Sequence, residues 1–179
     1  MSGDLGAAYL GLQILEREKQ LYLSNPGIQP DLENQQYLLE RQLKPEARKD
    51  MISYFAKDSL VPTAMIDISD GLASDLMHIC RASNVGAYVE EAKIPIHDDA
   101  QLMAIKFKMD PATTALNGGE DYELLFTIDE KDLEKVRYMP STYIIGEIAD
   151  KSDGITLHTT GGNIHPLKAQ GWNHFPNKE

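Results

Sequence analysis

Two carboxylates and a hydroxyl lie close together in the stretch Asp67-Ile68-Ser69-Asp70-Gly71-Leu72. The apolar residues before it predict a short buried strand over residues 64–68, and the periodic apolar residues from Leu72 onward predict a helix. A strand-to-helix turn is a frequent ligand site, because the helix N-terminus presents free N–H groups. Two carboxylates would repel a bare phosphate, so the pattern indicates a divalent cation between them and the anion. We therefore expect a Mg2+–nucleotide or Mg2+–phosphate site with Asp67 and Asp70 as metal ligands and the hydroxyl of Ser69 available beside them.

The same stretch has a simpler interpretation, in which Ser69 or Asp70 only caps the helix, as serine and aspartate often do. A calcium-binding EF-hand loop does not fit. Counted from Asp67, the positions that need glycine and glutamate are occupied by Leu72 and His78.

A second acidic motif is Gly118-Gly119-Glu120-Asp121-Tyr122-Glu123. Its glycines can end a helix or let a loop lie against a ligand. Glu120 and Asp121 then lie directly before an apolar segment, residues 122–128, which predicts a buried strand. A carboxylate there could bind an amino group or a cationic ring, or hold metal-bound water. The alternative is a capped helix followed by solvated acids.

A third motif, Gly171-Trp172-Asn173-His174-Phe175, lies near the C-terminus and contains the only tryptophan of the chain. The indole face of Trp172 can stack on a flat or cationic ring. It can equally anchor the tail to the body of the protein. The histidines show no convincing spacing for a metal site, and no Ser-His-Asp elbow, Walker loop or Rossmann glycine fingerprint is present.

The elements around these motifs predict a mixed-sheet α/β or α+β domain covered by helices. Helices are expected from Leu5 to about Lys19, from an Asp31 cap to Arg41, and from Pro45 onward. Further strands are expected at residues 86–90, 143–148 and 155–159, and a brief helix is expected from residue 111 to Gly118-Gly119. The last strand leads into a turn at Gly161-Gly162, so the end of the chain resembles a hairpin.

The composition excludes several classes of protein. The 179 residues carry 17 Lys and Arg against 28 Asp and Glu, a formal net charge of −11, and 42% of them are hydrophobic. This hydrophobic fraction is too high for a disordered chain, and the acidic balance argues against nucleic-acid binding. No apolar run is long enough for a membrane span. The single cysteine, Cys80, excludes an internal disulfide framework and favours a cytoplasmic protein.

The opening Gly3-Asp4-Leu5-Gly6 predicts a tight turn that is followed directly by a helix. Such a turn normally follows another element, so we expect a truncated chain whose first half has been removed. A natural protein that begins with a helix is the alternative.

Taken together and in order, the three motifs resemble those of the thiamine-monophosphate kinase family, and the strand residues Leu124-Leu125-Phe126 extend the second one. The stretches Gly3-Asp4-Leu5-Gly6-Ala7-Ala8 and Arg41-Gln42-Leu43-Lys44-Pro45 are also similar, so the resemblance runs along the whole chain. The wider superfamily includes aminoimidazole-ribonucleotide synthetase and selenophosphate synthetase. The terminal tryptophan motif favours the thiamine family.

The resemblance implies phosphoryl transfer from ATP to thiamine monophosphate, with no covalent enzyme intermediate and no residue singled out as catalytic. By motif, Asp67 and Asp70 would bind Mg2+, Ser69 would contact ATP, and Glu120 and Trp172 would contact thiamine monophosphate. The implied fold is the α+β, three-layer α/β/α domain with a mixed sheet, similar to the C-terminal domain of the PurM-like superfamily.

The family chain is longer, with an N-terminal domain that supplies further metal and nucleotide contacts and most of a homodimer interface. We therefore expect residues 1–30 to be the junction with a missing N-terminal domain, residues 31–179 to be the C-terminal domain, and the fragment alone to be inactive. Two alternatives stay open: a related synthetase of the same superfamily, and a non-catalytic ligand-binding module.

Overall fold

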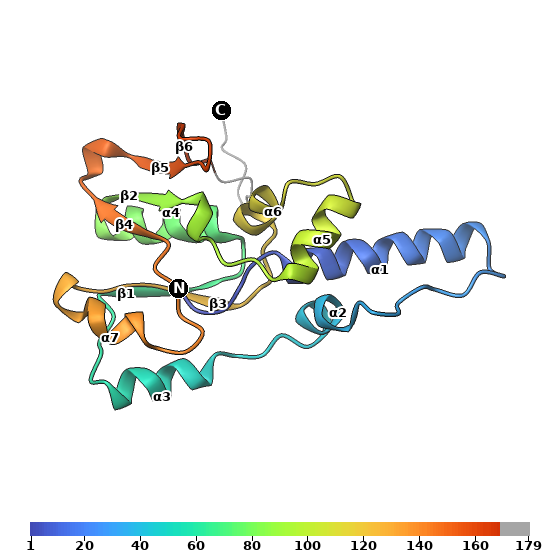
Figure 1. Cartoon of the computed structure of the whole chain (residues 1–179), viewed down its shortest axis with the longest axis horizontal. Helices are drawn as coiled ribbons and strands as arrows, with labels where there is room; N and C mark the ends of the chain where they lie inside the picture. The colour runs from blue at the N-terminus through green and yellow to red at the C-terminus, as the bar shows by residue number, and fades with distance from the viewer. Residues whose placement is uncertain (169–179) are drawn as a thin grey trace.

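The computed structural model describes residues 1–168, and Figure 1 shows the arrangement of their elements. The helices are α1 (Ala7–Ser24), α2 (Gln36–Leu43), α3 (Lys49–Lys57), α4 (Leu72–Ser83), α5 (Asp98–Lys106), α6 (Pro111–Asn117) and α7 (Leu133–Arg137), with short 3-10 turns at Glu91–Lys93, Glu130–Asp132 and Lys151–Asp153. The strands are β1 (Ala64–Ile68), β2 (Gly86–Glu90), β3 (Glu123–Thr127), β4 (Gly146–Ala149), β5 (Ile155–His158) and β6 (Ile164–Pro166). In this described part, no helix is long and apolar enough to cross a membrane.

The strands form two sheets. Strands β1 and β3 make an antiparallel pair, and the other four form a sheet in the order β4-β2-β5-β6. In that second sheet β2 and β5 run parallel, whereas β2 with β4 and β5 with β6 run antiparallel. This confirms the predicted α+β class with a mixed sheet and the hairpin at the end of the chain.

Three hydrophobic clusters hold these elements together. The largest joins β1, β3, α4 and β2, and its fully buried members include Leu5, Ile68 and Leu72. A second cluster packs α1 against α2 and α5. The third packs α3 and α7 against β3, where the rings of Phe55 and Phe126 meet edge to face with centroids 5.1 Å apart. The first cluster fixes the ends of β1 and β3, where the acidic motifs lie.

Several predicted boundaries were wrong for local reasons. Helix α2 begins after Gln35, whose side chain makes no capping bond, so Asp31 does not cap it. Helix α3 begins at Lys49, and Pro45 lies before it instead of in its first turn. The sequence analysis missed α5, which begins after His97 as its N-cap; the ring of His97 accepts a hydrogen bond from the Asp99 backbone at 3.2 Å.

Candidate functional site

The two acidic motifs lie against each other. Strands β1 and β3 pair side by side, so the turn after β1 meets the loop before β3. The backbone N–H of Glu120 donates to the carbonyl of Ser69 at 2.8 Å, and that of Tyr122 donates to the carbonyl of Ile68 at 2.8 Å. Residues far apart in the sequence therefore form one continuous surface, which the sequence alone did not show.

Glycines make this close approach possible. Gly119 has a φ of +69°, and a Cβ there would lie 2.7 Å from the carbonyl oxygen of Ser69. Gly71 has a φ of +108°, and a Cβ there would lie 2.9 Å from the carbonyl oxygen of Leu116. A side chain at either position would both strain the backbone and collide with the facing backbone atoms. Each glycine thus packs against protein backbone.

Asp75 organises the turn after β1. Its Oδ2 atom accepts hydrogen bonds from the backbone N–H groups of Ser69 and Asp70, both at 3.1 Å. Its side chain is buried, and this burial raises the pKa of Asp75 while the two N–H donors act in the opposite direction. The N-cap of α4 is Gly71, with no side-chain capping bond, so the interpretation of Ser69 or Asp70 as a helix cap is wrong. Sequence reasoning missed Asp75, although an acid in the first turn of a helix is a recognisable signal.

Asp70 belongs to a small group of ligand atoms on this turn. One ligand atom each from Asp70, Asp75 and His78 lie within 4.8 Å of one another. Two carboxylates offer the hard oxygen donors that Mg2+ prefers, whereas the imidazole is a less suitable ligand for it. The sequence analysis did not associate His78 with these acids. Asp67 is outside this group; it is exposed and, by strand alternation, faces away from the buried Ile68.

Within the second motif, Glu120 and Asp121 differ in environment. Glu120 is exposed, with a φ of +61°, and its carboxylate accepts a hydrogen bond from Gln42 at 2.9 Å. Asp121 is 3% exposed and caps the start of α1, where it accepts hydrogen bonds from the N–H groups of Gly6 at 2.8 Å and Ala8 at 3.2 Å. Burial raises the pKa of Asp121 to about 6. Of these two acids, only Glu120 is accessible to a ligand from solvent.

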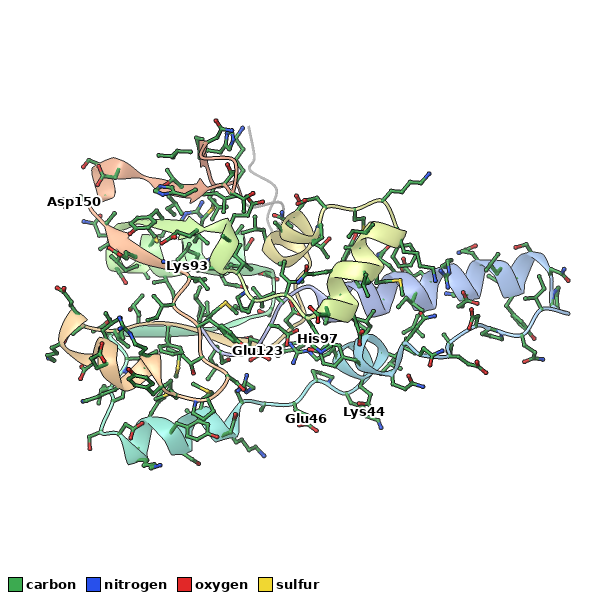
Figure 2. All side chains as sticks on the ribbon, in the orientation of Figure 1. Lys44, Glu46, Lys93, His97, Glu123 and Asp150 are labelled. Atoms are coloured by element: carbon green, nitrogen blue, oxygen red, sulfur yellow. The ribbon has the colours of Figure 1, made fainter. Side chains whose placement is uncertain are left out.

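Glu123 is a buried ion-pair partner. Its carboxylate is 2% exposed and contacts Ser2 Oγ at 2.6 Å, Arg41 Nη1 at 2.9 Å and Arg48 Nη1. In Figure 2 the labelled side chain lies between the β1–β3 pair and the connection from α2 to α3. The alternative of a solvated acidic loop is therefore wrong for Asp121 and Glu123. The arginines were missed as partners because nothing in their local spacing points to β3.

Trp172, the other predicted substrate contact, lies outside the described residues. Its role stays a prediction from the sequence.

The family described as AIR synthase related protein, C-terminal domain, matches residues 2–158. The chain belongs to this family. Both acidic motifs fall within the matched residues, so the AIR synthase related C-terminal domain contains the whole surface described above.

Several curated relatives of the chain are thiamine-monophosphate kinases. The chain is 36% identical to the thiamine-monophosphate kinase of Buchnera aphidicola subsp. Schizaphis graminum over 98% of its length and 51% of that protein. It is 33% identical to the thiamine-monophosphate kinase of Aquifex aeolicus, over 98% of the chain and 50% of that protein. The chain thus spans about half the length of the curated relatives it matches.

A solved structure described as AaThiL complexed with AMPPCP and TMP has a TM-score of 0.77 and 30% identity to the chain. The match covers 97% of this chain and 50% of that one. This similarity confirms the expected fold of the AIR synthase related C-terminal domain.

Proposed function

We propose that this chain is the C-terminal half of a thiamine-monophosphate kinase, which transfers a phosphoryl group from ATP to thiamine monophosphate and yields thiamine diphosphate and ADP. The observation that carries the proposal is the contact between the two acidic motif loops. It brings a turn suited to a Mg2+–nucleotide complex within reach of an exposed carboxylate suited to a cationic substrate. The solved relative described with both AMPPCP and TMP supports this pair of ligands.

The turn after β1 would serve the nucleotide side. Asp67 and Asp70 would hold Mg2+, and the hydroxyl of Ser69 would contact ATP. Bound Mg2+ would neutralise phosphate charge, and in phosphoryl transfer most of the catalysis comes from such neutralisation and from positioning. Asp75 supports this role indirectly, because it fixes the backbone of both Ser69 and Asp70.

The loop before β3 would serve the thiamine side. Glu120 presents an exposed carboxylate, which attracts the positively charged thiazolium ring of thiamine, and Gln42 orients that carboxylate. Trp172 would pack on the same substrate. Because thiamine monophosphate also carries a negative phosphate, one side of the substrate needs an acid and the other needs the cation.

The remaining assignments follow from the same proposal. The other half of the protein would supply further nucleotide and metal contacts and most of a homodimer interface, so this chain alone would be inactive. Residues 1–30 would form its junction with that half and residues 31–179 the C-terminal domain. The acidic composition and single cysteine support a location in the cytoplasm.

The metal assignment is tested by Asp67→Asn and Asp70→Asn in the complete gene product, assayed for thiamine diphosphate formation at limiting Mg2+. We expect each change to lower turnover by at least about 100-fold, as losses of transition-state charge stabilisation do, while the thermal melt stays close to that of the wild type. Asp153→Asn, the same change at an exposed site in a surface turn, is the matched control and should leave turnover unchanged. Near-normal turnover in either test variant would remove that residue from the metal site.

A further inference from the structure

Tyr122 is an exposed aromatic residue close to Glu120, the acid that the proposed function places on the thiamine side. Its side chain is 37% exposed, whereas its two neighbours in the chain, Asp121 and Glu123, are 3% and 2% exposed. Glu120 is exposed as well. The loop before β3 therefore buries two acids and presents a carboxylate and an aromatic ring to solvent, two residues apart.

The backbone at Tyr122 has an unfavourable conformation. Its φ is +52°, which lies in the left-handed region that bulky residues rarely adopt. Among residues 1–168, seven residues other than glycine have a positive φ, and Tyr122 is the only aromatic residue of the seven. Strain of this kind persists only where the surrounding structure enforces it, and it concentrates at functional sites.

Contacts on both sides of the loop enforce this conformation. The N–H of Tyr122 donates to the carbonyl of Ile68 at 2.8 Å. The N–H of Glu120 donates to the carbonyl of Ser69, also at 2.8 Å. Between these two residues, the buried carboxylate of Asp121 caps α1. The backbone that carries the ring is thus fixed, and a tyrosine side chain has only two torsions to lose when a ligand packs on it.

The described part of the chain gives the ring of Tyr122 no structural role. Within residues 1–168 its hydroxyl makes no hydrogen bond, and its ring makes no stacking or cation–π contact. Tyr122 also belongs to none of the three hydrophobic clusters. Packing and hydrogen bonding among these residues therefore do not explain why a bulky aromatic residue occupies a strained position.

A carboxylate and an aromatic ring that are presented together suit a flat cation. The face of an aromatic ring attracts a cation and packs on a planar group, and the carboxylate supplies the opposite charge. The thiazolium ring of thiamine is both flat and positively charged. The carboxylate of Glu120 would repel the phosphates of a nucleotide, so the pair also separates the two substrates.

We propose that Tyr122 is a further substrate-binding residue, whose ring packs on the thiazolium ring of thiamine monophosphate beside Glu120. This inference rests on the proposed function and adds a specificity-determining residue to it. The carboxylate selects the charge of the substrate ring, and the aromatic face selects its flat shape.

The inference is tested by steady-state formation of thiamine diphosphate with the complete gene product that contains this chain. Tyr122→Leu removes the ring, and we expect it to raise the KM for thiamine monophosphate about tenfold, as the loss of a cation–π contact does. The kcat and the KM for ATP should change by less than about twofold, because the contact forms with the bound substrate and its transition state alike. Tyr122→Phe keeps the ring and should stay close to the wild type. Tyr138→Leu, the same change at a residue 79% exposed at the end of α7, is the matched control and should leave all three constants unchanged.

A second variant separates binding from stability. Tyr122→Asn lacks the ring but tolerates a left-handed backbone. We therefore expect its unfolding temperature to equal or exceed that of the wild type, while its KM for thiamine monophosphate still rises about tenfold.

An unchanged KM for thiamine monophosphate in both Tyr122→Leu and Tyr122→Asn, with a wild type that turns over, would overturn the inference and leave the proposed function standing. A lower unfolding temperature in both variants with an unchanged KM would overturn it too, because the ring would then pack on another part of the protein. A complete, folded wild type without turnover would instead overturn the proposed function itself, and this inference with it.

Discussion

At the scale of single residues, burial decides what each acid of the second motif can do. Glu120 and Glu123 are three residues apart, yet one is exposed and the other is held by two arginines. A buried carboxylate with two cationic partners stabilises the fold and is out of reach of a ligand. An exposed carboxylate contributes little to stability and is available for binding.

Glutamine at these two positions should therefore have different effects: at Glu120 it should weaken substrate binding, and at Glu123 it should lower stability. Glu120→Gln should change the free energy of unfolding by less than about 0.5 kcal/mol and raise the thiamine monophosphate concentration needed for half-maximal turnover at least tenfold. Glu123→Gln leaves Arg41 and Arg48 without their anionic partner and should cost about 3–5 kcal/mol. Urea unfolding and steady-state kinetics on the complete gene product measure both. If Glu120→Gln unfolds the protein while its substrate requirement is unchanged, the assignment of roles is wrong.

The residue types at the site could be identified from the sequence, but their environments could not. The motif around Asp70 and the exposed acid Glu120 were identified because acidic residues beside a predicted turn can be recognised in the sequence. Asp75 was missed because its contact runs back to the turn, and the arginines were missed because they come from a distant helix and loop. Burial depends on tertiary packing, which one motif does not encode.

At the scale of elements, the two loops touch where a glycine faces a carbonyl. Gly119→Ala adds a Cβ that would lie 2.7 Å from Ser69 O at a φ of +69°. Gly162→Ala has a similar φ of +80° with nothing within 4 Å, so it carries the backbone strain without the collision. We expect Gly162→Ala to cost about 1 kcal/mol and Gly119→Ala clearly more, with loss of turnover. Thermal and urea unfolding provide the comparison, and equal costs would show that the loops are not in contact.

Asp121, which caps the start of α1, makes the stability of the folded chain depend on pH. Its pKa is raised by burial from 3.8 to about 6, so the folded state binds this proton more tightly than the unfolded state. The stabilisation is complete below the unfolded pKa near 4 and is lost as the pH rises through about 6. Asp121→Asn cannot ionise, so the difference in unfolding free energy between pH 4 and pH 6.5 should shrink by up to about 3 kcal/mol. Parallel stability profiles for the wild type and the variant would contradict this.

Elements with strong local signals were predicted well. Strands β1 and β2 match the expected ranges and helix α4 begins at Leu72 as expected, because the apolar pattern and the turn residues that bound each element agree there. Helices α2 and α3 begin later than expected, and α5 was missed. Helices α2 and α5 pack against α1, whereas α3 packs against β3 and α7, and such tertiary contacts leave no local signal. The separation into two sheets was not predicted, since pairing between distant strands leaves no local signal.

At the scale of the whole molecule, the chain holds its two acidic loops in contact and spans about half the length of its relatives. Phosphoryl transfer between two anions needs charge neutralisation and close positioning of both substrates. In the proposed function the two loops would supply an acid for each side, and we expect the remaining contacts to come from the other half of the protein.

The most direct measurement is Mg2+-dependent formation of thiamine diphosphate from ATP and thiamine monophosphate. It is run on this chain alone and on the complete gene product that contains it. We expect product only with the complete gene product, and only when Mg2+ is present. Absence of thiamine diphosphate from the complete, folded gene product with both substrates and Mg2+ would contradict it.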